Sequence, residues 1–489
     1  MITITGPHLF AFTAGLSPNE LCMKLLQKQR VRPAWAFASQ QIYACRMILM
    51  KFGGTSVGNA EAISHVASVV GHSLGRKPVV VVSAMTKITD ALIQLAEEST
   101  KGTGSGTLKL IRSVHEQTSE ALGIGRHICE PELRELEQLV SESSGAPLDA
   151  KRLDLFQSFG ERMCAKILAA KLSNDGTAAR AYNAWDVGMI TDDHFGNAEP
   201  LASSYALIKK AIAEINEVPV VTGFIGKTEA GEVTTLGRGG TDYSTSIIGA
   251  SIGAETIQIW KEVDGIMTTD PRIVPEARVV PELAFEEACE LAYFGAKVLH
   301  PKTIMPAMKA HIPVEVRNTF KPELPGTTIV STFAERSNKS AALEALSIKR
   351  RVTMLHIASP EFFEGSGLMA RIFSVLEKRG VSVDVIATSV ASVSLTMEHD
   401  ERLEEIAKEL SDIGEVSIEA NKAIICAVGG SVNAAGVAGR MFSVLGDAGV
   451  AISVEMISQA AGGVSITFVV DEKDAEQAVK TLHKEYLER

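Results

Sequence analysis

The stretch "MKFGGTSVGNAEAIS", from Met50 to Ser64, places one lysine at the end of an apolar run, directly before two glycines. The glycine pair favours a tight turn, and the residues after it have the apolar spacing of a helix. Two interpretations follow: an ordinary strand–turn–helix connection, or a turn where Lys51 and backbone N–H groups bind an anion. The rest of the chain distinguishes between them.

Composition restricts the class of protein. The chain has 489 residues, of which 46% are apolar and 22% charged, and this length predicts about two to four globular domains. The net charge of −11 argues against non-specific binding of nucleic acid. The six cysteines form no Cys-x-x-Cys pair, so neither a zinc site nor a disulfide framework is indicated. We therefore expect a reducing, cytoplasmic location.

Residues 1–46 differ from the remainder of the chain. They contain one acid, Glu20, against five lysines and arginines. A segment that directs the protein to an organelle is one interpretation. The interpretation that we favour is that Met47 is a natural start and that residues 1–46 are not native, because a strand pattern begins directly at Met47. The fold prediction therefore begins at residue 47.

The chain from Met47 alternates between strand-like and helix-like patterns. Apolar runs such as "PVVVVSAM" (Pro78–Met85) are apolar on both faces, which is typical of buried parallel strands. The alternation predicts an α/β domain over residues 47–330, with a parallel-rich sheet between helices. Ligands of such sheets bind at the carboxyl ends of the strands, which is where Lys51 lies. Residues 331–349 read as a linker.

The C-terminal part contains an internal repeat. The segment "GLMARIFSVLEKRGVSVDVIATS" begins at Gly367, and "GVAGRMFSVLGDAGVAISVEMIS" begins at Gly436, at a constant offset of 69 residues. Each copy reads as strand, helix, strand, strand, helix, strand. The repeat predicts two tandem ferredoxin-like modules, over residues 350–418 and 419–489.

Further motifs combine glycine with charged residues. They are "FGER" (Phe159–Arg162), "GRGGTD" (Gly237–Asp242), "VDGIMTTDPR" (Val263–Arg272) and "GAKVLHP" (Gly295–Pro301). Each alone is more often a turn or a helix cap than a site. In the first, Glu161 follows a glycine and is expected at the start of a helix. In the second, Arg238 has a guanidinium fork that suits a carboxylate.

Together and in this order, "KFGGTSV" and these four motifs resemble the motif series of the aspartate kinases, in the amino-acid kinase family. The tail modules are similar to ACT domains. The resemblance extends from about residue 47 to the C-terminus. It implies ATP- and Mg²⁺-dependent phosphorylation of the side-chain carboxylate of L-aspartate, giving 4-phospho-L-aspartate. This is the first step towards lysine, threonine and methionine, and the ACT modules would provide feedback regulation.

The resemblance also implies roles for individual residues. Lys51 and Asp242 are the expected catalytic pair: the lysine steadies the transferring phosphoryl group and the aspartate holds the lysine. Aspartate binding is assigned to Thr89, Glu161, Arg238, Gly239, Gly240 and Thr241. Nucleotide binding is assigned to Lys51, Gly53, Gly54, Lys261, Glu262, Met267, Arg272, Lys297 and Val298. No metal-ligating cluster is expected, because Mg²⁺ binds largely through phosphates and water.

An effector pocket is implied in the first module. Its expected residues are Gly367, Leu368, Ser382, Val383, Asp384, Thr388 and Ser389. Lysine is the expected inhibitor. Threonine is the alternative, because Val390 stands where an acid often follows Thr-Ser in this family, and a missing carboxylate weakens recognition of a cationic effector. ACT modules pair across chains, so the resemblance implies a homodimer or a larger homo-oligomer.

The implied chemistry agrees with the residue types. A side-chain carboxylate has an ordinary pKa of about 3.9 and needs no general base at neutral pH. The obstacle is repulsion between the carboxylate and the phosphates, which cations and backbone N–H groups relieve. Two rivals stay open: a related kinase acting on glutamate, a nucleotide or carbamate, and a catalytically inactive protein that senses amino acids.

Overall fold

The computed structural model describes residues 47–295, 299–337, 342–360, 367–447, 454–459 and 463–488. Residues 1–46 lie outside the described residues, so their role stays a prediction. Lys297 and Val298, expected at the nucleotide, also lie outside the described residues. Among the helices in the described ranges, none is long and apolar enough to cross a membrane.

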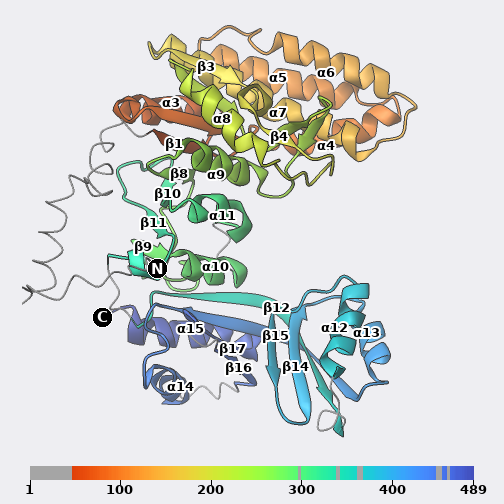
Figure 1. The fold of residues 1–489 in the computed structure, drawn as a ribbon, viewed down its shortest axis with the longest axis vertical. Helices are drawn as coiled ribbons and strands as arrows, with labels where there is room; N and C mark the ends of the chain where they lie inside the picture. Colours follow the sequence, from red (N-terminus) through yellow and green to blue (C-terminus); the bar gives the residue numbers. More distant parts are fainter. Residues whose placement is uncertain are drawn as a thin grey trace, which may run out of the picture. The chain divides into compact units, whose positions relative to one another are not determined.

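The first domain is built on an eight-stranded sheet with β1 in its middle (Figure 1). Strands β2, β5 and β3 continue on one side of β1 through parallel pairs, and β8 and β10 continue in parallel on the other. Their order is β3 (Ala179–Tyr182), β5 (Val218–Thr222), β2 (Pro78–Val82), β1 (Ile48–Phe52), β8 (Ile257–Lys261), β10 (Val314–Asn318), β11 (Thr327–Val330) and β9 (Glu282–Ala284). The expected parallel-rich sheet is confirmed, with the β10–β11 pair antiparallel.

Helices cover both faces of this sheet because its central strands are apolar on both sides. Met50 and Val80 belong to one core, with α3 (Ala60–His72), α4 (Ile88–Thr100), α5 (Ser105–Ala121), α6 (Glu130–Ser143) and α7 (Ala150–Asn174). Leu49 and Val81 belong to the other, with α8 (Ser203–Ala213), α9 (Gly240–Ile252), α10 (Phe285–Tyr293) and α11 (Pro301–Lys309). A small sheet of β4 (Ile190–Thr191), β6 (Ile225–Thr228) and β7 (Val233–Thr235) lies beside them.

The C-terminal part forms one six-stranded sheet, in which β12 and β15 run as two long neighbours (Figure 1). The strand order is β13 (Val385–Thr388), β14 (Ser392–Glu398), β12 (Ala345–Ala358), β15 (Glu415–Val428), β17 (Ser465–Asp471) and β16 (Met456–Ser458). Its helices are α12 (Leu368–Lys378), α13 (Leu403–Leu410), α14 (Val437–Asp447) and α15 (Glu472–Tyr486).

The two modules share these long strands. Residues 352–358 of β12 pair with β14 and with the first half of β15, while residues 345–349 pair with residues 424–428. The pairing register shifts near Arg351 and Asn421, whose φ angles are 58° and 60°. One of the four strands of the second module, residues 345–349, thus precedes the first module in the sequence. The first module is inserted into the second, and the expected division at residue 418 lies within β15.

Candidate active site

A cavity of about 260 Å³ opens at the carboxyl ends of β1 and β8. Lys51 is the fourth residue of β1, and Lys261 is the last residue of β8. The cavity is lined by Lys51, Gly53, Gly54, Thr55, Ser83, Lys261, Glu262 and Val263. Five of the residues that the sequence assigned to the nucleotide are therefore brought together at one place.

Two lysines share one buried carboxylate in this cavity. Lys51 Nζ lies 2.6 Å from Asp242 Oδ1, and Lys261 Nζ lies 3.6 Å from Asp242 Oδ2. Burial alone would raise the pKa of Asp242, but Lys51 and Lys261 outweigh burial and lower that pKa. Burial lowers the pKa of Lys261, and repulsion from Lys51 adds to this against the attraction of Asp242. Glu262, which also lines the cavity, is a second carboxylate that acts on Lys261.

The glycine turn after β1 lies close to the loop that follows β2. A Cβ on Gly54 would lie 3.1 Å from the carbonyl oxygen of Ala84, and one on Gly53 would lie 3.4 Å from Lys51 Nζ. A side chain on Gly54 would crowd the loop after β2. The turn leads into α3, where the Asn59 side chain accepts a hydrogen bond from Ala62 N–H at 2.9 Å. The strand–turn–helix connection and the cavity are thus both present.

The amino end of α9 faces the same strand ends. Gly239 precedes the helix with a φ of 75°, a conformation that glycine adopts without strain. Thr241 Oγ1 lies 2.8 Å from Ser83 Oγ, which joins the helix to the cavity wall. Gly240 and Thr241 are buried, whereas Arg238 is exposed. The Arg238 side chain has no hydrogen-bonding partner in the described part of the chain, so its fork is available to a ligand.

Glu161 lies in the middle of α7, not at a helix start as the sequence suggested. The preceding glycine is needed for packing, because a Cβ on Gly160 would lie 2.6 Å from the Cβ of Ala84. Glu161 Oε1 accepts a hydrogen bond from Ala84 N–H at 3.1 Å. Its other oxygen, Oε2, is buried without a hydrogen-bonding partner among the described residues. Burial raises the pKa of Glu161 to about 8, and a nearby cation would favour its ionised form.

Three further predicted residues lie apart from the cavity lining. Thr89 is half-buried in the first turn of α4. Met267 pairs with Val279 in an isolated bridge. Arg272 is exposed and lies 2.6 Å from Asp270. The structure does not bring these three to the cavity, and their roles stay predictions.

Three lining residues were not among the predicted ones: Thr55, Ser83 and Val263. Ser83 directly follows the buried strand β2, and its N–H donates to the carbonyl oxygen of Phe52 at 3.1 Å. Its position after a strand that is apolar on both faces was the signal that could have identified it.

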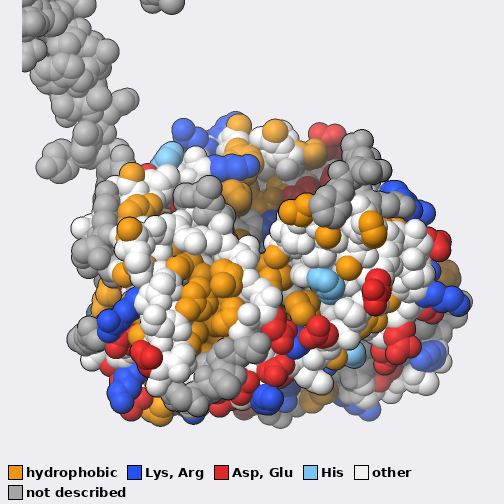
Figure 2. Space-filling view, turned by 90° about the horizontal axis from the view of Figure 1, so that it is seen from below, with side chains coloured by type: hydrophobic (Ala, Val, Ile, Leu, Met, Phe, Trp, Pro, Cys, Tyr) orange, Lys and Arg blue, Asp and Glu red, His pale blue; other side chains and the backbone are white. Residues whose placement is uncertain are grey.

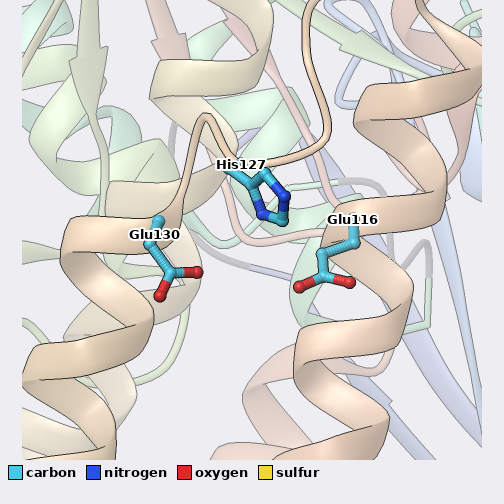
Figure 3. A group of neighbouring side chains, drawn as sticks. All are labelled: Glu116, His127 and Glu130. Atoms are coloured by element: carbon cyan, nitrogen blue, oxygen red, sulfur yellow. The ribbon is translucent and has the colours of Figure 1, made fainter.

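Away from the cavity, Glu116, His127 and Glu130 approach one another closely enough to hold a metal ion (Figure 3). Arginines already neutralise both acids. Arg112 donates to Glu116 at 3.2 Å and to Glu130 at 2.7 Å, and Arg126 donates to Glu116 at 2.9 Å. This arrangement is an ion-pair network.

The expected effector residues surround the start of α12 and strand β13. Gly367 precedes α12 with a φ of 109°, and Leu368 is buried. Asp384 is held by Lys349 Nζ at 2.5 Å and by the hydroxyl of Tyr293 at 2.8 Å. The remaining expected residues follow along the same segment, with Ser382, Thr388 and Ser389 exposed and Val383 half-buried.

Comparison with known proteins places the chain in a family. The amino acid kinase family matches residues 46–318, and an ACT domain matches residues 425–486. Aspartokinase 1, chloroplastic, of Arabidopsis thaliana is 40% identical to this chain, and the alignment covers 90% of this chain and 80% of that relative. Lysine-sensitive aspartokinase 3 of Escherichia coli is 34% identical, over 90% of this chain and 99% of its own.

A solved structure agrees with these relatives. The crystal structure of E. coli aspartokinase III in complex with lysine and aspartate (T-state) has a TM-score of 0.75 and 32% identity, over 90% of this chain and 99% of that chain. The chain belongs to the aspartokinases of the amino acid kinase family.

Proposed function

We propose that this chain transfers the γ-phosphoryl group of ATP to the side-chain carboxylate of L-aspartate, giving ADP and 4-phospho-L-aspartate. The observation that carries the proposal is the pair of lysines around Asp242 in the cavity at the strand ends. Such a cavity suits a polyanion, and family membership supports aspartate as the acceptor. The product opens the route to lysine, threonine and methionine.

The proposed roles follow from charge. Lys51 faces the phosphates and offsets charge as the phosphoryl group moves, while Asp242 fixes its position. The acceptor carboxylate is already ionised, so positioning rather than proton removal is required. Glu161 receives the α-ammonium group of the substrate, and Arg238 binds its α-carboxylate through two parallel hydrogen bonds. Thr89, Gly239, Gly240 and Thr241 complete the proposed substrate side.

On the nucleotide side, Gly53 and Gly54 offer backbone N–H groups to phosphate oxygens. Lys261, Glu262, Met267, Arg272, Lys297 and Val298 are proposed to hold the nucleotide. The residues fit a nucleotide that carries Mg²⁺, because the lining offers one carboxylate, Glu262, and the ion retains phosphate and water ligands. When bound, Mg²⁺ neutralises charge on the phosphate oxygens.

Regulation is proposed through the first ACT module, with lysine as the inhibitor and threonine as the alternative. The expected residues there include Asp384, a carboxylate that suits an ammonium group. The E. coli relative is a lysine-sensitive aspartokinase, which supports the choice of lysine.

We also propose a homodimer or larger homo-oligomer that forms through the ACT modules. Figure 2 looks at the molecule from the side of these modules and shows apolar side chains gathered on that face. The large exposed apolar residues of this part are Phe373, Ile386, Val390, Ile418 and Ile457. Burial against a second copy would remove them from water. Light scattering after size exclusion measures the mass, and a monomer at micromolar concentration would contradict the proposal.

A cytoplasmic location is proposed for the folded part, with targeting by residues 1–46 as the alternative. The described cysteines, Cys129, Cys164, Cys289 and Cys426, are free, as a reducing compartment favours. Fusion of residues 1–46 to a fluorescent protein distinguishes the two, since only a targeting segment would move the fusion into an organelle.

One assay tests the catalytic proposal. ADP release is measured with ATP, Mg²⁺ and L-aspartate, and the acyl phosphate is trapped with hydroxylamine. Glutamate, carbamate and uridine monophosphate serve as competing acceptors, and lysine and threonine are added in turn. Among these acceptors, only L-aspartate is expected to give turnover. Faster turnover with another acceptor favours a different amino-acid kinase, and no turnover favours an inactive sensor.

A further inference from the structure

Asp154 is a buried carboxylate to which the proposed mechanism gives no role. It lies near the start of α7 and is 1% exposed. No lysine or arginine of the described residues forms an ion pair with it. Burial raises the pKa of Asp154, and hydrogen bonds to its oxygens oppose this rise. A charge in such a place is costly unless its oxygens are hydrogen-bonded, so the partners of Asp154 indicate what it does.

Both oxygens of Asp154 bind the same small part of the backbone. Oδ2 accepts hydrogen bonds from the N–H groups of Thr235 and Gly196, each at 2.8 Å. Oδ1 accepts a third hydrogen bond, from the hydroxyl of Thr235, at 2.7 Å. Thr235 is the last residue of β7, and Gly196 lies in the loop before α8. The carboxylate therefore joins α7, β7 and this loop at one point.

The turn that carries Arg238 begins directly after Thr235. The N–H of Ala198, in the loop before α8, donates to the carbonyl oxygen of Thr235 at 2.9 Å. Gly237 has a φ of 71°, and a Cβ on it would lie 2.6 Å from Asn197 Oδ1. The loop before α8 thus packs closely against the backbone that leads to Arg238.

Helix α7 also carries Glu161, seven residues after Asp154. Seven residues are nearly two turns of a helix, so the two side chains lie on the same face. Glu161 is proposed to receive the α-ammonium group of the substrate, and Arg238 its α-carboxylate. One helix therefore supports both of the groups that are proposed to bind the α-carbon substituents.

We infer that Asp154 is a positioning residue for L-aspartate, which fixes the backbone before Arg238 so that the guanidinium fork meets the α-carboxylate. The inference rests on the proposed role of Arg238 in substrate binding. Asp154 acts through the hydrogen bonds that it accepts, and it does not touch the substrate. An amide oxygen at the same place would accept the same two N–H groups.

The test is a double-mutant cycle on the full chain, read from the KM for L-aspartate. Asp154→Ala is expected to raise this KM about tenfold, because two N–H groups lose their acceptor and the turn shifts. The kcat and the KM for ATP should change less than about threefold. In an Arg238→Ala background, the same change should raise the KM less than about twofold, because the side chain that it positions is already absent. Asp154→Asn should stay within about threefold of the unaltered protein.

Strand β7 offers a matched pair of milder variants. Thr234 and Thr235 are adjacent and buried, but the Thr234 hydroxyl lies 2.7 Å from the hydroxyl of Thr191 instead of binding Asp154. Thr235→Val removes one hydrogen bond to Asp154 and is expected to raise the KM for L-aspartate about threefold. Thr234→Val removes an equally buried hydroxyl and is expected to leave that KM unchanged. This pair tests the inference even if Asp154→Ala does not fold.

The outcomes are distinguishable. If ATP and L-aspartate give no turnover, the proposed function and this inference both fall. If turnover occurs but Arg238→Ala leaves the KM for L-aspartate unchanged, the role of Arg238 and the inference fall together while catalysis stands. If Arg238→Ala raises the KM but Asp154→Ala raises it equally in both backgrounds, only the inference is overturned. Equal KM values in Thr234→Val and Thr235→Val would overturn it in the same way.

Discussion

Lys51 at the end of β1 and Asp242 in the first turn of α9 form a buried ion pair of 2.6 Å. The pair joins the central strand to the helix whose amino end faces the cavity. Lys261 shares the same carboxylate at 3.6 Å. Removing Asp242 would leave the two lysines without their shared counter-charge in a poorly solvated place.

Lys51→Ala is expected to lower kcat by roughly two to three orders of magnitude, the usual cost of losing one preorganised charge donor. The effect on ATP affinity should be modest, because Lys261 remains in the cavity. Steady-state kinetics with ATP and L-aspartate measure both. Lys101→Ala, which removes an exposed lysine, is the control. A kcat close to normal in Lys51→Ala would exclude its catalytic role.

The KM for L-aspartate is expected to depend on pH through Glu161. Burial raises the pKa of Glu161 to about 8, and only its ionised form attracts an ammonium group. Below pH 8 the KM should rise, approaching about tenfold per pH unit. Glu161→Gln should raise the KM by about ten- to a hundredfold and make it independent of pH. An identical pH profile in the two proteins would contradict this assignment.

The same carboxyl group affects stability. Its pKa in the folded chain is about 8 against an ordinary value of 4.5. Between these values the folded chain holds a proton that the unfolded chain has released, so the free energy of unfolding falls as pH rises. L-Aspartate should restore the loss by binding the ionised form. Urea unfolding at pH 6 and 8, with and without L-aspartate, measures the effect, and equal stabilisation by L-aspartate at both values would argue against it.

Arg238→Lys is expected to raise the KM for L-aspartate about tenfold with little change in kcat, because a point charge replaces a planar fork. The exposed pair of Arg76 and Glu255, 2.9 Å apart, supplies the control variant Arg76→Lys. The two variants are compared by initial rates at varied L-aspartate. An unchanged KM in Arg238→Lys would remove this residue from the substrate site.

Arg336→Met is expected to destabilise the chain by about 3–5 kcal/mol. Arg336 is buried and donates two hydrogen bonds to the buried Glu287, at 2.8 and 2.9 Å. The methionine would leave that carboxylate without its cation. Arg76→Met breaks only an exposed pair and should cost less than about 1 kcal/mol. Urea unfolding compares the two, and equal unfolding midpoints would show that the buried pair is dispensable.

The sequence was informative where structure is local. The "KFGG" motif predicted a strand end, a glycine turn and a helix, since these depend on neighbouring residues, and Lys51 was found there. Glu161 was expected at a helix start, because Gly160 reads as a break in the helix, but it lies within α7. The absent side chain of Gly160 instead makes room for Ala84, which is distant in sequence.

Relationships between distant segments could not be predicted. The arrangement of Lys51 and Lys261 around Asp242 depends on β8 lying next to β1. No short-range sequence pattern predicts this strand order. The hydrogen bond between Tyr293 and Asp384 depends likewise on the packing of two domains. The repeat predicted two modules correctly, but the strand that completes the second one lies upstream of both repeated segments.

That upstream strand has a consequence for biosynthesis. Ala345 pairs with Val428, so the whole first module must be synthesised before the pairing can form. At ordinary rates of translation the wait is on the order of ten seconds. Throughout this time residues 345–349 of the nascent chain are an unpaired edge that can associate with other chains. The yield of folded protein should therefore depend on chaperones that act during translation, and not on the stability of the final fold alone.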